Sequence, residues 1–243
     1  LNTMIVDSSA LLERACDDIM RSAFNSAGQR CSALRLLLVH EEVYSELLLL
    51  LKGAMKDLTI GLPDELDTDV GPIITLDATK KLKQYLTKME SDGHFLFQAP
   101  NKNVPSKGPW IVPTLIELKL ESMPSEEQFG PILHVTSFSE DTLIDSLKQI
   151  NAKGFALTFG IHTRIDAKAL DIAKQTSSGN IYINRDIVGA VVETQPFGGK
   201  NLSGSGFKAG GPNYLLQFMD ERVTTVNTVA IGGNIDLINL NDG

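Results

Sequence analysis

The sequence predicts an α/β protein with a largely parallel, twisted sheet that carries helices on both faces. Two observations predict this class. Short apolar runs alternate along the chain with longer segments whose apolar residues recur at helical spacing, and such alternation is typical of βαβ units with parallel strands. The 243 residues are 42% hydrophobic and 21% charged, so the chain has enough apolar material to bury a core.

Each element follows from its local pattern. Continuous or alternating apolar runs predict strands over residues 4–7, 34–39, 95–97, 111–116, 132–138, 156–162 and 181–184. Apolar residues three or four positions apart predict helices over 10–24, 42–56, 77–90, 142–150, 167–175 and 213–219. Ser8 and Ser9 are candidate caps of the first helix. Prolines, glycines and aspartates mark 61–72 as a turn-rich stretch, 189–211 is a glycine-rich loop, and 223–229 alternates like a final strand.

Composition excludes several classes of protein. Acidic residues number 30 against 22 basic ones, no dense Lys/Arg cluster occurs, and we therefore expect no nucleic-acid partner. The longest leucine run, Leu47 to Leu51, is far shorter than the ~20 apolar residues of a membrane span, so we expect none. The first residues do not resemble a secretory signal. Two cysteines without a CxxC pair favour a reducing, cytoplasmic location. The scattered histidines show no metal-ligand spacing, so we expect no metal site, and a site that folding assembles from distant residues is the alternative.

Two phosphate-binding patterns are present only in part. Residues 204–209 fit a relaxed G-x-G-x-x-G/A pattern, but no strand precedes them and Gly210-Gly211-Pro212 prevents an immediate helix. Gly199-Lys200 is followed by Asn201 where a phosphate loop needs Ser or Thr. Neither pattern therefore predicts a nucleotide site.

The two cysteines differ in their surroundings. Cys16 lies within the first predicted helix and is expected to be a small buried residue. Cys31 lies in a break of small and polar residues, 25–32, between a helix and a strand, where reactive groups are often carried. It is a candidate nucleophile, although no His or Asp beside it in the sequence supplies a base.

Four ordered motifs carry a family resemblance. Residues 24–35 closely resemble the cysteine motif of aldehyde dehydrogenases, and Glu127-Gln-Phe-Gly-Pro131 resembles the E-x-F-G-P motif of that family. Residues 179–184, and 196–199 followed by Ser203-Gly204, match two further motifs, so the likeness covers nearly the whole chain. Within the family, residues 157–164, 180–192 and 208–212 are similar to the half of bacterial proline utilization A enzymes that is an L-glutamate γ-semialdehyde (1-pyrroline-5-carboxylate) dehydrogenase.

The resemblance implies a mechanism and a cofactor. Cys31 would attack the aldehyde carbon to form a thiohemiacetal, hydride would pass to NAD, and water would hydrolyse the resulting thioester. The backbone N–H of Cys31 would help to hold the oxyanion. Glu127 would bind the nicotinamide ribose hydroxyls, and Phe129 would pack beside the cofactor. Without the motif, Glu127 would be interpreted as an ordinary solvated carboxylate.

The resemblance also implies how the substrate is bound. The Ser32 hydroxyl and the backbone N–H groups of Gly189 and Ala190 would hold the α-carboxylate of L-glutamate γ-semialdehyde, because small residues let a backbone approach a ligand closely. Phe197 would pack on the aliphatic part of the substrate. A plain turn at 189–190 and simple core packing of Phe197 are the alternatives.

The resemblance implies a division of the protein. Residues 1–221 would be the catalytic domain and 222–243 an oligomerisation strand of a homo-oligomer. The NAD-binding domain, a glutamate base for hydrolysis and an oxyanion asparagine would precede Leu1, and FAD would belong to a separate proline dehydrogenase domain. We therefore expect the chain alone to be inactive. A dehydrogenase for another small acid semialdehyde, and a non-catalytic module that keeps the fold, are the rival hypotheses.

Overall fold

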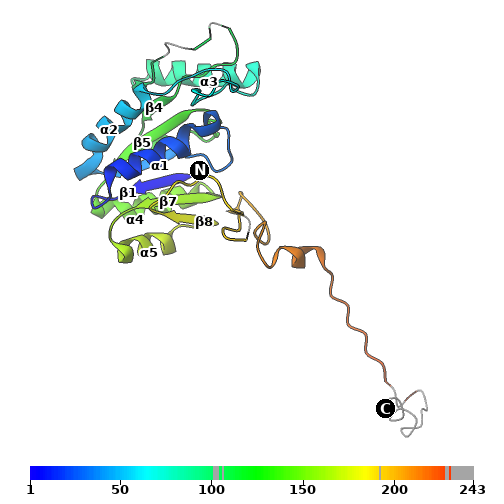
Figure 1. The fold of residues 1–243 in the computed structure, drawn as a ribbon. Coiled ribbons are helices and arrows are strands. Elements are labelled where there is room, and N and C mark those ends of the chain that lie inside the picture. The colour runs from blue at the N-terminus through cyan, green and yellow to red at the C-terminus, as the bar shows by residue number, and fades with distance from the viewer. Residues whose placement is uncertain (101–103, 106, 192, 228–229, 231–243) are drawn as a thin grey trace.

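The structure, a computed structural model, describes residues 1–100, 104–105, 107–191, 193–227 and 230. Its centre is a seven-stranded sheet in the order β3-β4-β5-β2-β1-β7-β8 (Figure 1). The strands are β1 (Thr3–Val6), β2 (Leu36–His40), β3 (Phe95–Gln98), β4 (Thr114–Glu117), β5 (Ile132–Phe138), β7 (Thr158–His162) and β8 (Asn180–Ile183). All neighbouring strands are parallel except the pair formed by β3 and β4. The predicted fold class is confirmed.

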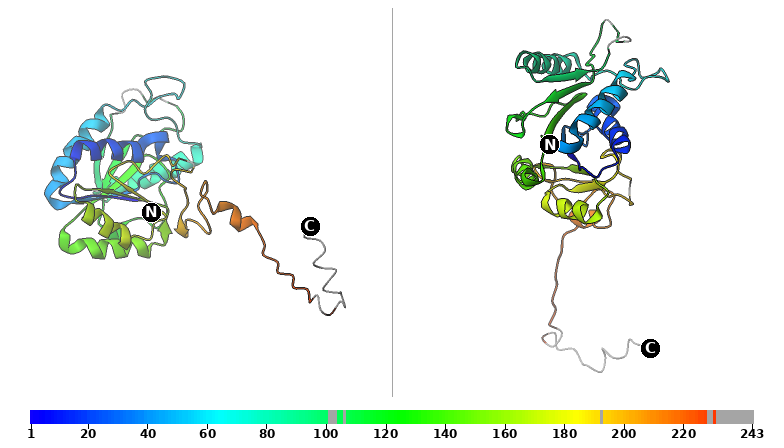
Figure 2. Two further views of the ribbon diagram at one scale, coloured as in Figure 1. Left: turned by 60° about the horizontal axis from the view of Figure 1, so that its bottom comes forward. Right: turned by 90° about the vertical axis from the view of Figure 1, so that its left-hand side faces the viewer.

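Helices cover both faces of the sheet. They are α1 (Leu12–Phe24), α2 (Glu41–Lys56), α3 (Leu76–Ser91), α4 (Glu140–Ala152) and α5 (Asp166–Gln175). Figure 2 shows α1 and α2 together on one face, with α3 and α4 on the other. Because both faces are covered, every residue of β1 and β2 is buried, as expected of continuous apolar strands in a parallel sheet. Within the described part of the chain, no helix is both long and apolar enough to cross a bilayer.

The structure corrects the predicted cap of the first helix. The residue that precedes α1 is Leu11, and it makes no side-chain cap. Ser9 instead donates from its hydroxyl to Asp7 Oδ2 over 2.7 Å and from its backbone N–H to the same oxygen over 3.2 Å. Asp7 is fully buried, and a buried carboxylate requires such donors. The Ser9 hydroxyl therefore binds Asp7 and does not cap the first turn of α1.

Three further elements differ from the sequence prediction. The expected strand at 156–162 is divided into β6 (Phe155–Ala156) and β7, and β6 pairs antiparallel with β9 (Lys200–Asn201), which returns the glycine-rich loop to the body. The expected helix at 213–219 is the 3₁₀ helix η3 (Tyr214–Phe218). β3 lies antiparallel at the sheet edge, which the apolar pattern alone did not distinguish.

The end of the described chain extends away from the body (Figure 1). Residues 223–227 belong to no strand and are exposed, and residues 228–229 of the expected strand lie outside the described residues. A strand forms only against a partner, so its role in joining subunits stays a prediction.

Candidate active site

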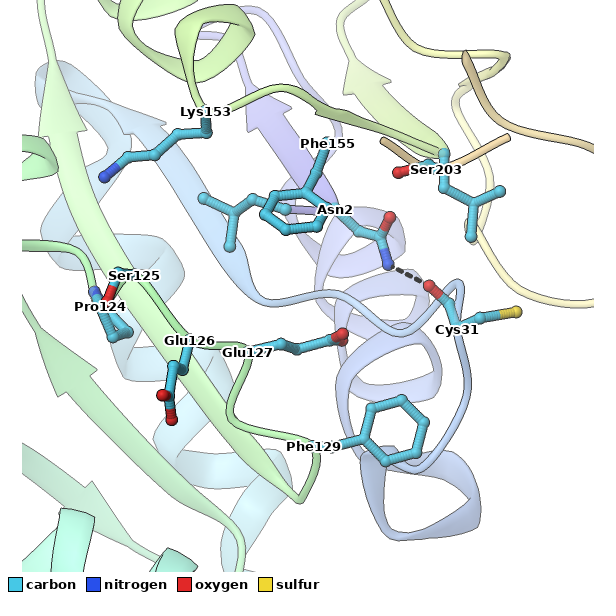
Figure 3. Close-up of a pocket in the computed structure, with 12 residues that line it drawn as sticks. Asn2, Cys31, Pro124, Ser125, Glu126, Glu127, Phe129, Lys153, Phe155 and Ser203 are labelled. Atoms are coloured by element: carbon cyan, nitrogen blue, oxygen red, sulfur yellow. Dashed lines mark hydrogen bonds between the residues drawn. The ribbon is translucent and has the colours of Figure 1, made fainter. Parts of the chain in front are cut away.

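The candidate site lies at the amino ends of the central parallel strands. Cys31 lies between the 3₁₀ helix η1 (Asn25–Gly28) and β2, Asn2 directly precedes β1, and Leu157 directly precedes β7. Glu127 and Phe129 lie in the loop that leads into β5. Because these strands are parallel neighbours, the segments that lead into them meet at the end of the sheet where the strands begin (Figure 3).

The two thiols have opposite environments. Cys31 is exposed, and the backbone that carries it is held by Asn2, whose Nδ2 donates to Cys31 O over 2.7 Å and to Ala33 O over 2.8 Å (Figure 3). The side chain of Cys31 points away from Glu127. Cys16 is only 5% exposed, and burial raises the pKa of its thiol to about 11, so it stays protonated. The structure therefore bears out the contrast predicted from the sequence.

Two cavities flank Cys31. The first has a volume of about 250 Å³ and is lined by Leu1, Asn2, Cys31, Pro124, Ser125, Glu126, Glu127, Phe129, Lys153, Phe155, Leu157 and Ser203 (Figure 3). The second has a volume of about 380 Å³, and its lining includes Cys31, Leu157, Phe197, Ser203, Phe207 and Tyr214. The thiol residue is thus shared by a cavity that contains the two predicted cofactor residues and one that contains the predicted substrate residue Phe197.

Left-handed backbone leads into the loop that carries Cys31. Ser26, Ala27 and Gly28 have φ values of 55°, 53° and 65°. Such a conformation costs roughly 1–2 kcal/mol for a residue with a side chain, so the surroundings must enforce it. Gly28 has no such penalty, and the space around it excludes a side chain: a Cβ there would lie 2.3 Å from the carbonyl oxygen of Gly130. The cysteine motif and the E-x-F-G-P motif are therefore packed backbone to backbone.

Arg35 is the site residue to which the sequence analysis gave no role. It is 1% exposed, and its Nε donates to Glu127 Oε1 over 2.9 Å. Its Nη1 donates to Gly130 O over 3.0 Å, and its Cζ lies 5.1 Å from the centre of the Phe129 ring. Burial lowers the pKa of Arg35, and the Glu127 carboxylate opposes that shift. A charged residue inside a run of apolar residues was the available signal, because buried charges require partners.

Two of the family motifs, residues 179–184 and 196–199, pack together beside the second cavity. Asn180 donates from Nδ2 to Pro196 O over 2.9 Å, and its Oδ1 accepts from the backbone N–H of Gly198 over 3.1 Å. Phe197 and Ala209 exchange two backbone hydrogen bonds of 2.9 Å. These contacts fix the backbone on both sides of Phe197.

The structure does not bring the three residues predicted to bind the substrate carboxylate into either cavity. Ser32 is buried, and its side-chain hydroxyl has no hydrogen-bond partner in the part of the chain that the structure describes. Gly189 and Ala190 are exposed, and Gly189 has a φ of 78°. Their loop is anchored to α1, because the N–H of Ile187 donates to Ser22 Oγ over 3.1 Å. None of the three predicted residues lines the two cavities, so their grouping around a substrate stays a prediction.

The described residues offer no group of three or more His, Cys, Asp or Glu side chains that could hold a metal ion. An exposed, positioned cysteine between two cavities instead defines a site suited to thiol chemistry. The fold and the motifs specify the group further: the chain belongs to the aldehyde dehydrogenase family, whose model matches residues 1–224.

The chain is similar to parts of longer proteins. It is 44% identical over 236 residues to the bifunctional protein PutA of Escherichia coli, a match that covers 95% of this chain and 18% of that protein. A crystal structure of proline utilization A from Bradyrhizobium japonicum superposes with a TM-score of 0.88 at 44% identity, covering 95% of this chain and 23% of that one. A 1-pyrroline-5-carboxylate dehydrogenase from Thermus with bound NAD has a TM-score of 0.80 at 29% identity, covering 90% and 42%.

Proposed function

We propose that this chain carries the nucleophile of an NAD-dependent L-glutamate γ-semialdehyde dehydrogenase that acts in the breakdown of proline to glutamate. The observation that carries the proposal is the exposed Cys31 between two cavities, one with Glu127 and Phe129 and the other with Phe197. The similarity to PutA and to a 1-pyrroline-5-carboxylate dehydrogenase supports the substrate.

Cys31 would act through its sulfur. After its proton has passed to solvent, Sγ attacks as a thiolate and forms a bond to the aldehyde carbon, while the π electrons of the C=O bond move to the oxygen and make it an oxyanion. The backbone N–H of Cys31 donates to no acceptor among the described residues, and so it is free to stabilise that oxyanion. After hydride loss the acyl group remains on Sγ as a thioester, and water releases it as the carboxylate.

The residues of the first cavity fit one part of a nicotinamide cofactor. Arg35 engages one oxygen of Glu127, and the Glu127 side chain is 48% exposed, so its other oxygen can accept from ribose hydroxyls. Phe129 is 41% exposed and presents an aromatic ring for packing. When bound, NAD supplies the acceptor for the hydride that leaves the substrate carbon.

Ser32, Gly189, Ala190 and Phe197 would hold the substrate. The Ser32 hydroxyl, which has no partner among the described residues, would donate to the α-carboxylate. No described atom lies within 4 Å of where a Cβ of Gly189 would be, so a carboxylate could approach its N–H. Phe197 would contact the aliphatic carbons. The chain spans 18% of the E. coli PutA protein. In this proposal other segments supply the rest of the cofactor site, so the 243-residue chain alone should show no dehydrogenase turnover.

The first test labels the chain with an electrophilic aldehyde analogue and locates the adduct by mass spectrometry. We expect an adduct on Cys31, its loss in Cys31→Ser, and its retention in the matched control Cys16→Ala. An unmodified Cys31 in the folded chain would support the non-catalytic module and reject the proposal.

The second test uses the longest polypeptide that the reading frame of this chain encodes. NADH formation is measured with glutamate semialdehyde and with succinate semialdehyde. Preference for glutamate semialdehyde supports the proposed substrate, whereas preference for succinate semialdehyde replaces it with the rival semialdehyde. Turnover by the 243-residue chain alone would contradict the division of the site between segments.

A further inference from the structure

We infer that Arg35 is a positioning residue for the cofactor: one buried guanidinium orients Glu127 and Phe129 and ties them to the loop that carries Cys31. The inference rests on the proposed function. It assigns a role to Arg35, although Arg35 makes no hydrogen bond with the Cys31 thiol among the described residues. Four independent contacts of Arg35 support it.

Three of these contacts reach the loop before β5. The guanidinium donates to Glu127 Oε1 over 2.9 Å and to Gly130 O over 3.0 Å, and it lies over the Phe129 ring at 5.1 Å. The side chains of Glu127 and Phe129 both contribute to the first cavity and are both partly exposed. Among the described residues, Arg35 is the hydrogen-bond partner of the Glu127 side chain and the cation that lies over the Phe129 ring, so its contacts help to restrict both rotamers.

The fourth contact and the backbone of Arg35 reach the nucleophile loop. Nη2 donates to the carbonyl oxygen of Arg30, the residue before Cys31, at a long 3.5 Å. The backbone N–H of Arg35 donates to Asn2 O over 3.1 Å, and Asn2 in turn holds Cys31 O. Arg35 thereby links the carboxylate that would bind the cofactor to the backbone that presents the thiol.

The contacts require a guanidinium. Nε, Nη1 and Nη2 point in three fixed directions of one plane, and each has its own acceptor. A lysine ammonium could reach one of these acceptors but could not satisfy all three or stack on Phe129. Arg35 is 1% exposed, so water does not freely replace the donors that a substitution removes.

The test measures NAD binding by calorimetry in the longest polypeptide of this reading frame. We expect Arg35→Lys to raise the Kd for NAD about tenfold to a hundredfold, the loss typical of charge-assisted hydrogen bonds. Glu127→Gln should raise the Kd as well, and the double variant should lose less than the product of the two single effects. Arg14→Lys is the matched control, since Arg14 is exposed and pairs only with Asp18 among the described residues; it should bind NAD like the wild type.

Arg35→Gln is the second variant, because it removes the buried charge and leaves a half-exposed Glu127 that water can solvate; it should lose NAD affinity too. If either variant folds and binds NAD as tightly as the wild type, or if the Arg35→Lys effect multiplies fully with that of Glu127→Gln, Arg35 is only structural. Absence of NAD binding by the wild type also overturns the inference. NAD binding that depends on Arg35, without oxidation of the semialdehyde, would reject the proposed function and leave the inference standing.

Discussion

The contact between Gly28 and Gly130 allows a sharp test of how the site is assembled. A Cβ on Gly28 would lie 2.3 Å from Gly130 O, 2.7 Å from Gly130 C and 2.9 Å from Ala23 O. All three atoms belong to the backbone, so a rotamer change cannot relieve the clash. The φ of 65° adds the penalty that any residue with a side chain has in the left-handed region.

The magnitude follows from these two contributions. The left-handed penalty is roughly 1–2 kcal/mol, and forced backbone shifts typically add about 1–3 kcal/mol. We therefore expect Gly28→Ala to lower the free energy of unfolding by about 2–5 kcal/mol. At about 2–4 °C per kcal/mol for a domain of this size, Tm should fall by roughly 4–20 °C.

Two glycines of the same chain separate the contributions. Gly93 has a φ of 78°, and no described atom lies within 4 Å of where its Cβ would be, so Gly93→Ala should report the left-handed penalty alone. Gly53 lies inside α2 with equally open space, so Gly53→Ala should stabilise the protein by about 0.5–1 kcal/mol. The assay is the denaturant midpoint of each variant, together with the rate of Cys31 alkylation, which should change only in Gly28→Ala. If Gly28→Ala and Gly93→Ala are equally destabilised, the inferred backbone contact between the two motifs is wrong.

Two further predictions concern buried ionisable groups. Burial lowers the pKa of His134 to about 4; its Nδ1–H donates to Arg35 O over 3.0 Å and its Nε2 accepts from the Tyr85 hydroxyl over 2.7 Å. Since the folded value lies below the ordinary value near 6.5, the stability that neutral His134 contributes is complete above about pH 6.5, and about 3 kcal/mol of it is lost as the pH drops toward 4. His134→Gln should therefore reduce the pH dependence of the unfolding free energy, measured with urea across that range, and an unchanged dependence would contradict the assignment. Burial alone would raise the pKa of Asp7, but hydrogen bonds from Lys168, Ser9 and Thr163 lower it to about 2. Asp7→Asn should therefore destabilise the protein by about 1.5–3 kcal/mol at neutral pH, and the difference from the wild type should shrink below about pH 4; a difference that is constant down to pH 2 would count against this ion cluster.

The positions of the helices and strands were largely predictable, because burial on one or both faces leaves a period in the sequence. The cap of α1 was not predictable, because the Ser9 hydroxyl binds Asp7, and only the folded structure shows that Asp7 is buried and needs a donor. The antiparallel edge strand β3 was not, because a short apolar run carries no sign of its direction.

For the candidate site, the sequence alone determined that Cys31 lies in a break between elements and that Cys16 lies within a helix, because local composition records whether a position must pack. The family motifs came from the sequence as well. Only the tertiary structure decided that the segments before β1, β2, β5 and β7 meet at the amino ends of these strands, and that Arg35 is buried against Glu127. These are contacts between residues some 30 to 130 positions apart, and strand order, which local patterns do not encode, brings them together.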